Sequence, residues 1–566
     1  MKKKLVALTL SLAMAATAFA GCGAQDVSES PSNASTETAV TGTETSTAGT
    51  ETSTEGTDVA EEIPVDKFAG TELTIVVKKH NYDTGESWED KPAMKAAEEA
   101  TGININWIMI DSGQTERINA MLAGDMPDAF IGNMVKEDTI GANKELFYDL
   151  SEEGLLETYA PDVLEDIKSL NGGNGLDLIK WPDGSIRSLI TNDASNYAND
   201  AEGIMVINKA WLDKLGLQIP TTADEFYNVL CAFRDNDMNG DGDASNEVPF
   251  NITQKFWTSK ILQGANSWGI AGYTNASKSH YLQLKDGKIT STVDTDEFRA
   301  FLEYYNKLVN EGLINLDCFS ETSDQRSAKL LSGTVGCFWA WTPEDVGDSE
   351  LAKEYVVLPP FQALEGVEPV KSGTRDKETF YNNGLVISAE CKNVEALLHW
   401  WNYLSSSTEM KYFVKYGEQG QAWDIDANGN VFLKTPDGIT ADFTINNYHY
   451  TYGWSSYSPL ILKDELPVVD TTDPYASDAW RKSMVDAVYD MIPEESFSTK
   501  KFIEPEKLEE RDFIEEELDA YISNFVSTSI IEGVTDESWA AHLEQLKTVQ
   551  YYEWLEWYQK YVDGTL

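Results

Sequence analysis

The strongest constraint on the fold is an alternation of strand and helix patterns that begins near residue 73. Five successive segments follow it: 73–77 (strand), 92–101 (helix), 103–110 (strand), 114–123 (helix) and 129–132 (strand). Strands joined by single helices predict a parallel sheet, and such sheets hold ligands at the carboxyl ends of their strands. The pattern therefore predicts an α/β fold with candidate ligand positions in the loops after the first and third strands.

The chain is longer than one ordinary domain and too acidic to bind a polyanion. Its 566 residues are roughly three to four times a typical domain, so at least two cores are expected. It carries 43 Lys and Arg against 95 Asp and Glu, a formal net charge of -52. This charge repels phosphate backbones and excludes nucleic acid as a partner.

The N-terminus has the layout of an export signal followed by a tether. Three lysines precede an apolar run at 5–20, which is shorter than a bilayer span. The run ends in Phe-Ala-Gly-Cys22, which resembles a bacterial lipoprotein box, so a signal peptide at 1–21 and lipidation of Cys22 are expected. Residues 22–65 read as a disordered Ser/Thr/Glu linker. The alternatives are an ordinary signal peptide with a chance cysteine, and a glycosylated stalk.

The most specific local motif is an Asp-rich loop at 235–248. The predicted metal ligands are Asp237, Asn239, Asp241, Asp243, Ser245 and Glu247. Alternate-residue oxygens with a glycine at the sixth position match a calcium loop, because a curling chain aims them at one hard cation. Position 12 is Val248, which displaces the expected carboxylate to Glu247. A single loop predicts a structural calcium ion, and the alternative is an acidic solvated turn.

The remaining four cysteines carry no metal-thiolate signature. They are Cys231, Cys318, Cys337 and Cys391. Their spacing is wide and contains no C-x-x-C pair. Buried thiols and up to two disulfides both stay open, and a core of this size favours thiols because it needs no staples.

Several motifs occur in an order that resembles a known family. They are ERINAMLAGDMPD at 116–128, FYDL at 147–150, GIMVINKAWLDKLGLQIPTT at 203–222 running into the Asp-rich loop, SGTVG at 332–336, GEQG at 417–420 and an aromatic tail at 539–561. Together they resemble the extracellular solute-binding proteins of ABC sugar importers, of the family 1 type. Within these, the chain is most similar to the large lipoprotein branch that includes the alginate-binding receptors. The likeness runs from about residue 66 to the C-terminus.

This resemblance implies a two-lobed α/β clamp with discontinuous lobes joined by hinge segments. We expect 66–195 with 325–380 in lobe 1, 200–320 with 385–530 in lobe 2, and a helical segment at 535–562. It also implies a non-enzymatic, monomeric lipoprotein on the extracellular face of the bacterial membrane. Such a protein captures an oligosaccharide and delivers it to ABC permease subunits. In the alginate receptors the calcium loop is distant from the sugar, which supports a structural role.

Sugar recognition directs attention to aromatic and planar polar side chains in loops. Aromatic rings pack on pyranose faces, while hydroxyl groups need donors and acceptors. The predicted ligand contacts are Asn81, Tyr82, Trp88, Asn133, Trp257, Trp268, Trp339, Trp341 and Trp454. Alternation along a strand would point the rings of Trp339 and Trp341 to one side. The acidity of the chain favours neutral oligosaccharides over acidic ones.

Two rival classes remain, a secreted calcium-dependent carbohydrate-active enzyme and a peptide-binding receptor of an ABC importer. The sequence contains no G-x-S-x-G, H-E-x-x-H or P-loop motif. A glycosidase needs two carboxylates about 5 to 10 Å apart, and no spacing here singles out such a pair. A peptide receptor would carry charged anchors for the peptide ends instead of stacked rings. Both classes are less favoured than the sugar receptor.

Overall fold

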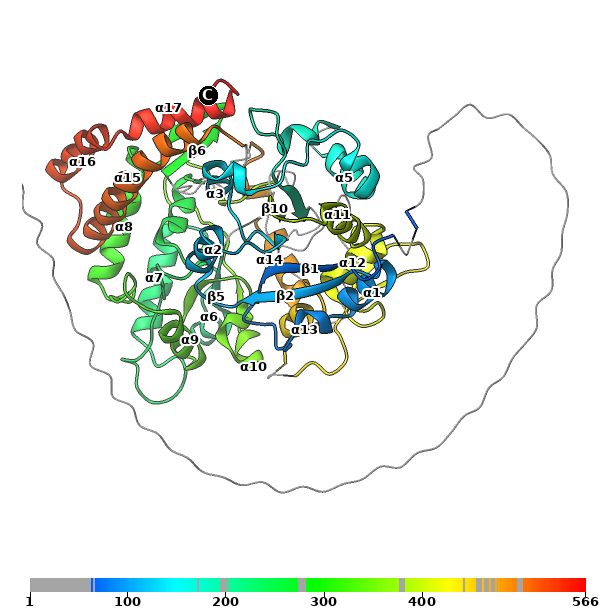
Figure 1. The fold of residues 1–566 in the computed structure, drawn as a ribbon. Coiled ribbons are helices and arrows are strands. Elements are labelled where there is room, and N and C mark those ends of the chain that lie inside the picture. The colour runs from blue at the N-terminus through cyan, green and yellow to red at the C-terminus, as the bar shows by residue number, and fades with distance from the viewer. Residues whose placement is uncertain are drawn as a thin grey trace, which may run out of the picture. The chain divides into compact units, whose positions relative to one another are not determined.

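Two sheets, each covered by its own hydrophobic core, organise the part of the chain that the structure describes (Figure 1). The structure is a computed structural model. It describes residues 63–64, 67–170, 173–193, 201, 203–272, 281–375, 382–440, 443–454, 461–462, 468–469, 474–475, 477–495 and 502–566. The expected signal peptide, Cys22 and nearly all of the linker lie outside these residues. Within them, no helix is both long and apolar enough to cross a membrane.

Lobe 1 is built on a six-stranded sheet in the order β13-β4-β10-β3-β1-β2. Its strands are β1 (Glu72–Lys78), β2 (Asn104–Ile110), β3 (Ala129–Ile131), β4 (Leu189–Asp193), β10 (Asn382–Ile387) and β13 (Ile461–Leu462). The first three strands are parallel to one another, as predicted, but β10 runs antiparallel to both β3 and β4. The sheet is therefore mixed.

Helices cover both faces of this sheet, because alternate residues of β1 point to opposite sides. Leu73, Ile75 and Val77 join one core with helices α1, α4, α5, α11 and α12, whereas Val76 joins another with α2 and α3. The helices of lobe 1 are α1 (Pro92–Thr101), α2 (Gln114–Leu122), α3 (Glu137–Ala142), α4 (Leu155–Tyr159), α5 (Pro161–Ser169), α11 (Val394–Tyr403), α12 (Thr408–Tyr416) and α13 (Ile445–Tyr452). Three short strands, β11 (Trp423–Ile425), β12 (Val431–Leu433) and β14 (Val468–Val469), form a separate sheet.

Lobe 2 is built on a three-stranded antiparallel sheet in the order β8-β5-β9. Its strands are β5 (Ile204–Asn208), β8 (Cys337–Ala340) and β9 (Tyr355–Val357), and β6 (Leu282–Lys285) with β7 (Lys288–Ser291) forms a separate hairpin. Its helices are α6 (Lys209–Leu215), α7 (Ala223–Arg234), α8 (Asp296–Asn310), α9 (Ser323–Leu331), α10 (Ser349–Ala352), α14 (Ser477–Asp486), α15 (Pro505–Glu532), α16 (Asp536–Thr548) and α17 (Tyr551–Val562). The long helix α15 packs along α8, and α16 and α17 follow it (Figure 1).

The expected division into lobes is wrong in two places. Segment 325–380 was expected in lobe 1, but its strands β8 and β9 pair with β5 in lobe 2. Segment 385–530 was expected in lobe 2, but only its later part, with α14 and α15, packs there. Its earlier part belongs to lobe 1, because β10 pairs with β3 and β4 and α11 packs in the lobe 1 core. The choice of partner strand depends on contacts between distant segments, which local sequence patterns do not report.

Several tryptophans and thiols lie inside the two lobes, and the thiols agree with the sequence expectation. Trp400, Trp401, Trp554 and Trp557 are buried in the two cores. The four cysteines between residues 231 and 391 are unpaired thiols, of which Cys231 is half-buried and the other three are buried.

Candidate functional site

The loop that follows β1 is fixed to the C-terminal end of α13 by a buried lysine. Lys91 Nζ lies 3.0 Å from Asp83 Oδ2, and both side chains are almost fully buried. The same ammonium group donates to the carbonyl oxygens of Thr451 (3.2 Å) and Gly453 (3.0 Å). The amide of Thr84 donates to the Thr451 hydroxyl at 3.1 Å. These contacts fix the loop at the carboxyl end of β1, where ligands were expected.

The loop places a histidine and a tyrosine beside a second tyrosine from α13. The His80 ring stacks on Tyr450, with ring centroids 3.9 Å apart and planes 12° apart, and Tyr82 lies exposed beside them. Burial, helped by the charge of Lys78, lowers the pKa of His80 to about 4. The imidazole is therefore neutral at physiological pH and behaves as an aromatic surface.

The loop after β3 meets this group at a small cavity of about 20 Å³. Its lining includes His80, Asp83, Gly132 and Tyr450. Asn133, the next residue, is buried in a left-handed conformation (φ 61°), and its amide donates to the carbonyl of Asn383. The loops after the first and third strands therefore come together, as the alternating pattern predicted. Asn81 is exposed next to them.

Two tryptophans of lobe 2 form a second aromatic group. Trp257 is 58% exposed, and its ring centroid lies 5.2 Å from that of the half-buried Trp341. The Arg481 guanidinium lies 3.8 Å from the Trp341 ring centroid and donates to the carbonyl of Trp341 at 3.1 Å. One ring of the pair is thus backed by a buried cation while its neighbour is open to solvent.

Charges from lobe 2 reach the aromatic group of lobe 1. The pKa of Tyr82 is raised by burial and, in addition, by the carboxylates of Asp345 and Glu344. Both carboxylates lie on the turn that follows Trp341, in the 3-10 helix Pro343–Val346. The carboxylates of this turn therefore act on Tyr82 electrostatically, although Asp345 is itself paired with Arg326.

Two of the predicted ligand residues are core residues of lobe 2, so the expectation of sugar contact is wrong for them. Trp268 is 2% exposed and packs against Phe301 and Tyr304. Trp339 is 3% exposed and packs 5.0 Å from Phe250. The argument from alternation failed because β8 ends at Ala340, so Trp341 has already left the strand and points elsewhere.

Two further predicted residues lie beneath the aromatic group of lobe 1. Trp88 and Trp454 are buried and meet edge to face at 4.6 Å. Both line the small cavity together with His80 and Tyr450. They support the exposed rings from below and present no open face, so direct contact with a sugar is not expected from them in this conformation.

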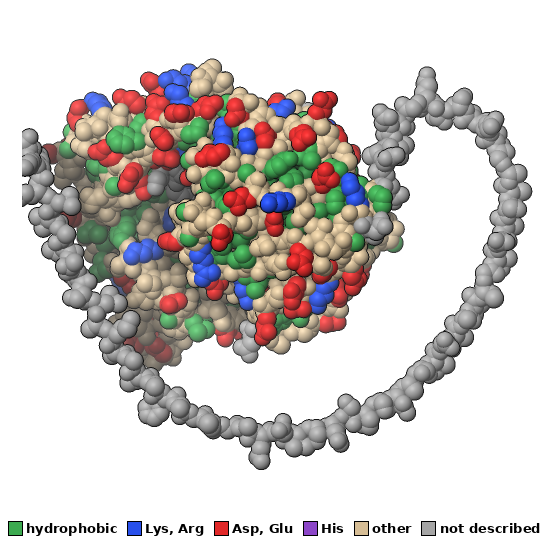
Figure 2. Space-filling view, viewed as in Figure 1, with side chains coloured by type: hydrophobic (Ala, Val, Ile, Leu, Met, Phe, Trp, Pro, Cys, Tyr) green, Lys and Arg blue, Asp and Glu red, His purple; other side chains and the backbone are tan. Residues whose placement is uncertain are grey.

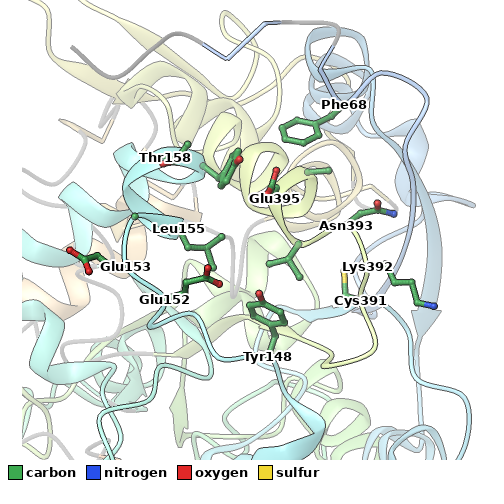
Figure 3. A pocket seen from close by; sticks show the side chains of 14 residues that line it. Phe68, Tyr148, Glu152, Glu153, Leu155, Thr158, Cys391, Lys392, Asn393 and Glu395 are labelled. Atoms are coloured by element: carbon green, nitrogen blue, oxygen red, sulfur yellow. The ribbon is translucent and has the colours of Figure 1, made fainter. Parts of the chain in front are cut away.

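Figure 3 shows a larger cavity, of about 510 Å³, in lobe 1. It lies near the amino end of β1, whereas the loops described above follow the carboxyl ends of β1 and β3. It is bordered by Phe68, which precedes β1, and by Cys391, which follows the antiparallel strand β10. Residues between Tyr148 and Tyr159, among them Glu152, complete the lining together with residues 392–396. Its lining contains none of the predicted ligand residues, and it does not lie where the lobes meet.

A family comparison decides the class of protein. The model for bacterial extracellular solute-binding proteins matches residues 82–411, which is more than half of the chain. The chain belongs to this family.

Individual family members resemble the chain over most of its length. The fructooligosaccharide ABC transporter substrate-binding protein FusA of Streptococcus pneumoniae is 25% identical over 487 residues, which cover 84% of this chain and 87% of FusA. The structure of FusA with kestose matches with a TM-score of 0.74 at 22% identity, covering 87% of this chain and 99% of FusA, and an EF-hand mutant of FusA with fructo-nystose matches at 0.73.

Two other solved members share the fold. An extracellular solute-binding protein from Bifidobacterium longum subsp. infantis matches with a TM-score of 0.72 at 25% identity, covering 88% of this chain and 98% of that protein. The alginate-binding protein AlgQ2 without calcium ion matches with a TM-score of 0.60 at 20% identity, with the same coverage. The expected two-lobed solute-binding fold and the resemblance to the alginate receptors are thereby confirmed.

The Asp-rich loop of this family member follows α7 and keeps its carboxylates turned toward its own backbone. Asp237 accepts from the amides of Gly240 (2.7 Å) and Gly242 (2.9 Å), and Asp241 accepts from the amide of Asp243 (2.8 Å). Among the described residues, no three His, Cys, Asp or Glu side chains converge as metal ligands. The loop is thus curled with its oxygens drawn inward.

Glu247 is the residue of this loop that best fits a cation. Its side chain is 8% exposed, and Oε1 accepts from the amide of Met238 at 2.7 Å. Oε2 is buried and has no hydrogen-bond partner among the described residues. A buried carboxylate oxygen without a partner is costly, and a hard cation held by the loop oxygens would remove that cost. Asp235, just upstream, is instead paired with Arg234.

Several residues of the site were not among the predicted contacts. His80, Arg326, Asp345 and Arg481 surround or support the aromatic groups. Arg326 and Arg481 are remote from Trp341 in sequence, so no local motif could have linked them to it. His80 stood one residue before the predicted Asn81, in a loop already marked as a ligand position.

Proposed function

We propose that this solute-binding protein captures a neutral oligosaccharide between its lobes for import by an ABC transporter. The observation that carries the proposal is the Trp257–Trp341 pair of lobe 2, in which the Trp257 ring is open to solvent. The apolar faces of a sugar ring pack on such aromatic groups. The likeness to FusA, a fructooligosaccharide-binding protein, over most of both chains supports this class of ligand.

The net charge of the chain supports a neutral ligand. Acidic side chains are spread over the face of the molecule seen in Figure 2, in keeping with the formal charge of -52. An acidic oligosaccharide would therefore be opposed at long range.

In this proposal the sugar stabilises the closed arrangement because it contacts both lobes at once. The closed, loaded protein would then be recognised by the permease subunits, and the protein itself would act as a monomer without catalysing a reaction. Lipidation of Cys22 would keep it on the extracellular face of the cell membrane.

We also propose that the loop at 235–248 binds a structural calcium ion. The support is the oxygen spacing of the loop together with the buried, unpartnered Oε2 of Glu247. A bound ion would neutralise the carboxylates of the loop, and Asp237, Asn239, Asp241 and Glu247 would hold it. FusA, described with an EF-hand that has been mutated, agrees with a loop of this type.

The test of the main proposal is isothermal titration calorimetry with matched oligosaccharides. Kestose and nystose would represent neutral fructans, maltotriose a neutral glucan, and trigalacturonate an acidic ligand. We expect at least one neutral oligosaccharide to bind and trigalacturonate not to bind. Trp257→Ala should weaken the affinity by at least about tenfold, or ~1.4 kcal/mol, whereas the control Phe513→Ala, which removes another exposed ring, should not.

Other outcomes would assign the protein to a rival class. Hydrolysis of the bound oligosaccharide, detected by chromatography of the titration mixture, would replace the receptor with an enzyme. Saturable binding of a short peptide without binding of any oligosaccharide would replace the sugar receptor with a peptide receptor.

A further inference from the structure

We propose that Arg326 is a positioning residue for sugar binding, which holds Trp257 and Trp341 in a fixed relation to each other. The inference rests on the proposed function and names the group that shapes its aromatic surface. Arg326 lies on α9 and is buried, with 3% of its side chain exposed. Its role would be exerted through neighbouring residues.

The first link runs from Arg326 to the backbone around Trp341. The Arg326 guanidinium donates to the carbonyl of Trp339 and to Asp345 Oδ2, both at 3.0 Å. The same Asp345 oxygen accepts from the backbone amide of Trp341 at 3.3 Å. One arginine therefore fixes the chain on both sides of Trp341, at the point where β8 ends and the chain turns.

The second link runs from Arg326 to the residue next to Trp257. The guanidinium carbon lies 4.1 Å from the ring centroid of Phe256, within the range of a cation–π contact. The same carbon lies 5.6 Å from the ring centroid of Phe338, which is on strand β8. The Arg326 guanidinium therefore contacts one ring from the segment that carries Trp257 and one ring from the segment that carries Trp341.

The helix and the ion pair that hold Arg326 are themselves fixed by further contacts. Helix α9 begins with a complete capping box, in which Thr322 and Gln325 satisfy each other's backbone amides. Burial raises the pKa of Asp345 while the charge of Arg326 opposes that rise. The Arg326–Asp345 ion pair also satisfies two backbone groups. It has few alternative arrangements, because moving either side chain away would leave the other as an uncompensated buried charge.

Fixing the two rings in advance should raise affinity. Trp257 and Trp341 belong to segments more than 80 positions apart, and their ring centroids lie 5.2 Å apart, in the normal range of an aromatic contact. If the rings were free to move separately, a sugar would have to order both on binding, at a cost in conformational entropy. Arg326 reduces that cost because it joins the two segments below the rings.

The experiment is a double-mutant cycle on oligosaccharide affinity, with Arg326→Met and Trp341→Ala and the tightest neutral oligosaccharide of the calorimetric panel as the ligand. In the wild-type background, we expect Arg326→Met to weaken binding by about tenfold. In the Trp341→Ala background, the same change should weaken it by less than about twofold, because the group that Arg326 positions is gone. The control is Arg511→Met, since Arg511 also pairs with a carboxylate and lies near a tryptophan, but on α15.

Further readouts separate positioning from folding. Arg326→Lys keeps the charge for Asp345 but lacks the planar group over Phe256, so it should fold and show an intermediate loss of affinity. Equal effects of Arg326→Met in both backgrounds, or wild-type affinity of both Arg326 variants, would overturn the positioning role and leave the proposed function standing. Failure of the wild-type protein to bind any oligosaccharide would overturn both.

Discussion

Lys91 and Asp83 form an ion pair inside lobe 1, with Nζ and Oδ2 3.0 Å apart and side chains 3% and 4% exposed. Because Lys91 also donates to backbone carbonyls at the end of α13, Lys91→Met would leave one buried carboxylate and several carbonyls without their partner. We expect the free energy of unfolding to fall by about 3–5 kcal/mol. Urea denaturation followed by tryptophan fluorescence would measure it.

The same substitution should also weaken sugar binding, because the loop that it releases carries His80 and Tyr82. Lys95→Met is the matched control, since Lys95 pairs with Asp90 on the surface of the neighbouring helix. That exposed pair should contribute less than about 1 kcal/mol. Equal losses of stability in the two variants would contradict a special role for the buried pair.

The proposed calcium site predicts a stability effect that is separate from sugar binding. Calcium at about 100 times its dissociation constant should stabilise the folded protein by about 2.7 kcal/mol, and a chelator should reverse this. Glu247→Gln should reduce the calcium-dependent rise in melting temperature by most of its size, because it removes the charge of the buried carboxylate. Differential scanning fluorimetry with calcium and with EGTA would measure both.

Asp235→Asn provides the control for this experiment. Asp235 precedes the predicted ligands, and its carboxylate is held by Arg234, so the calcium-dependent shift should persist in that variant. An unchanged shift in Glu247→Gln would remove Glu247 from the site. Loss of sugar affinity on chelation without loss of stability would move the ion from a structural to a ligand-binding role.

His80 should make stability depend on pH in the mildly acidic range. Burial lowers its pKa from 6.5 to about 4, so between these values the unfolded chain binds more protons than the folded one. The contribution of His80 is therefore fully present above pH 6.5 and is lost as the pH falls toward 4. Phe at this position would keep a ring against Tyr450 without a titrating group.

We expect the difference in melting temperature between His80→Phe and the wild type to shift in favour of the variant as the pH falls from 7 to 4.5. His399 and His542 also have pKa values lowered by burial, but they are common to both proteins and cancel in the difference. A difference that does not change with pH would show that the pKa of His80 is the same in the folded and unfolded chains, and would contradict the lowered pKa.

Local elements were predictable because their signals are local. Helix α1 ends where expected since Gly102 adopts the left-handed conformation that closes it, with φ 67°. Thr222 caps α7, since its side chain accepts from the amide of Glu225. The Glu225 carboxylate in turn accepts from the amide of Thr221.

The aromatic site was predictable only in part, because burial depends on partners that are distant in sequence. Trp257 is exposed and Trp341 is half-buried, whereas Trp268 and Trp339 lie in the core of lobe 2. Where β8 ends depends on its pairing with β5, whose Ile204 lies opposite Ala340. The local sequence around Trp341 does not indicate the register in which β8 pairs with β5.

A glycine at the start of lobe 2 offers a test of how tightly Trp257 is held. Gly203 lies just before β5, and a Cβ atom there would come within 1.9 Å of the carbonyl oxygen of Thr258, the residue after Trp257. Gly203→Ala should therefore force the Trp257 loop to move, at a cost of about 1–3 kcal/mol of stability, and should also weaken oligosaccharide binding. Gly124→Ala is the control, because the nearest atom to its added Cβ is 3.3 Å away at a helix end in lobe 1. Calorimetry and thermal unfolding of the two variants would measure both effects, and full retention of affinity in Gly203→Ala would mean that the position of Trp257 is unimportant for binding.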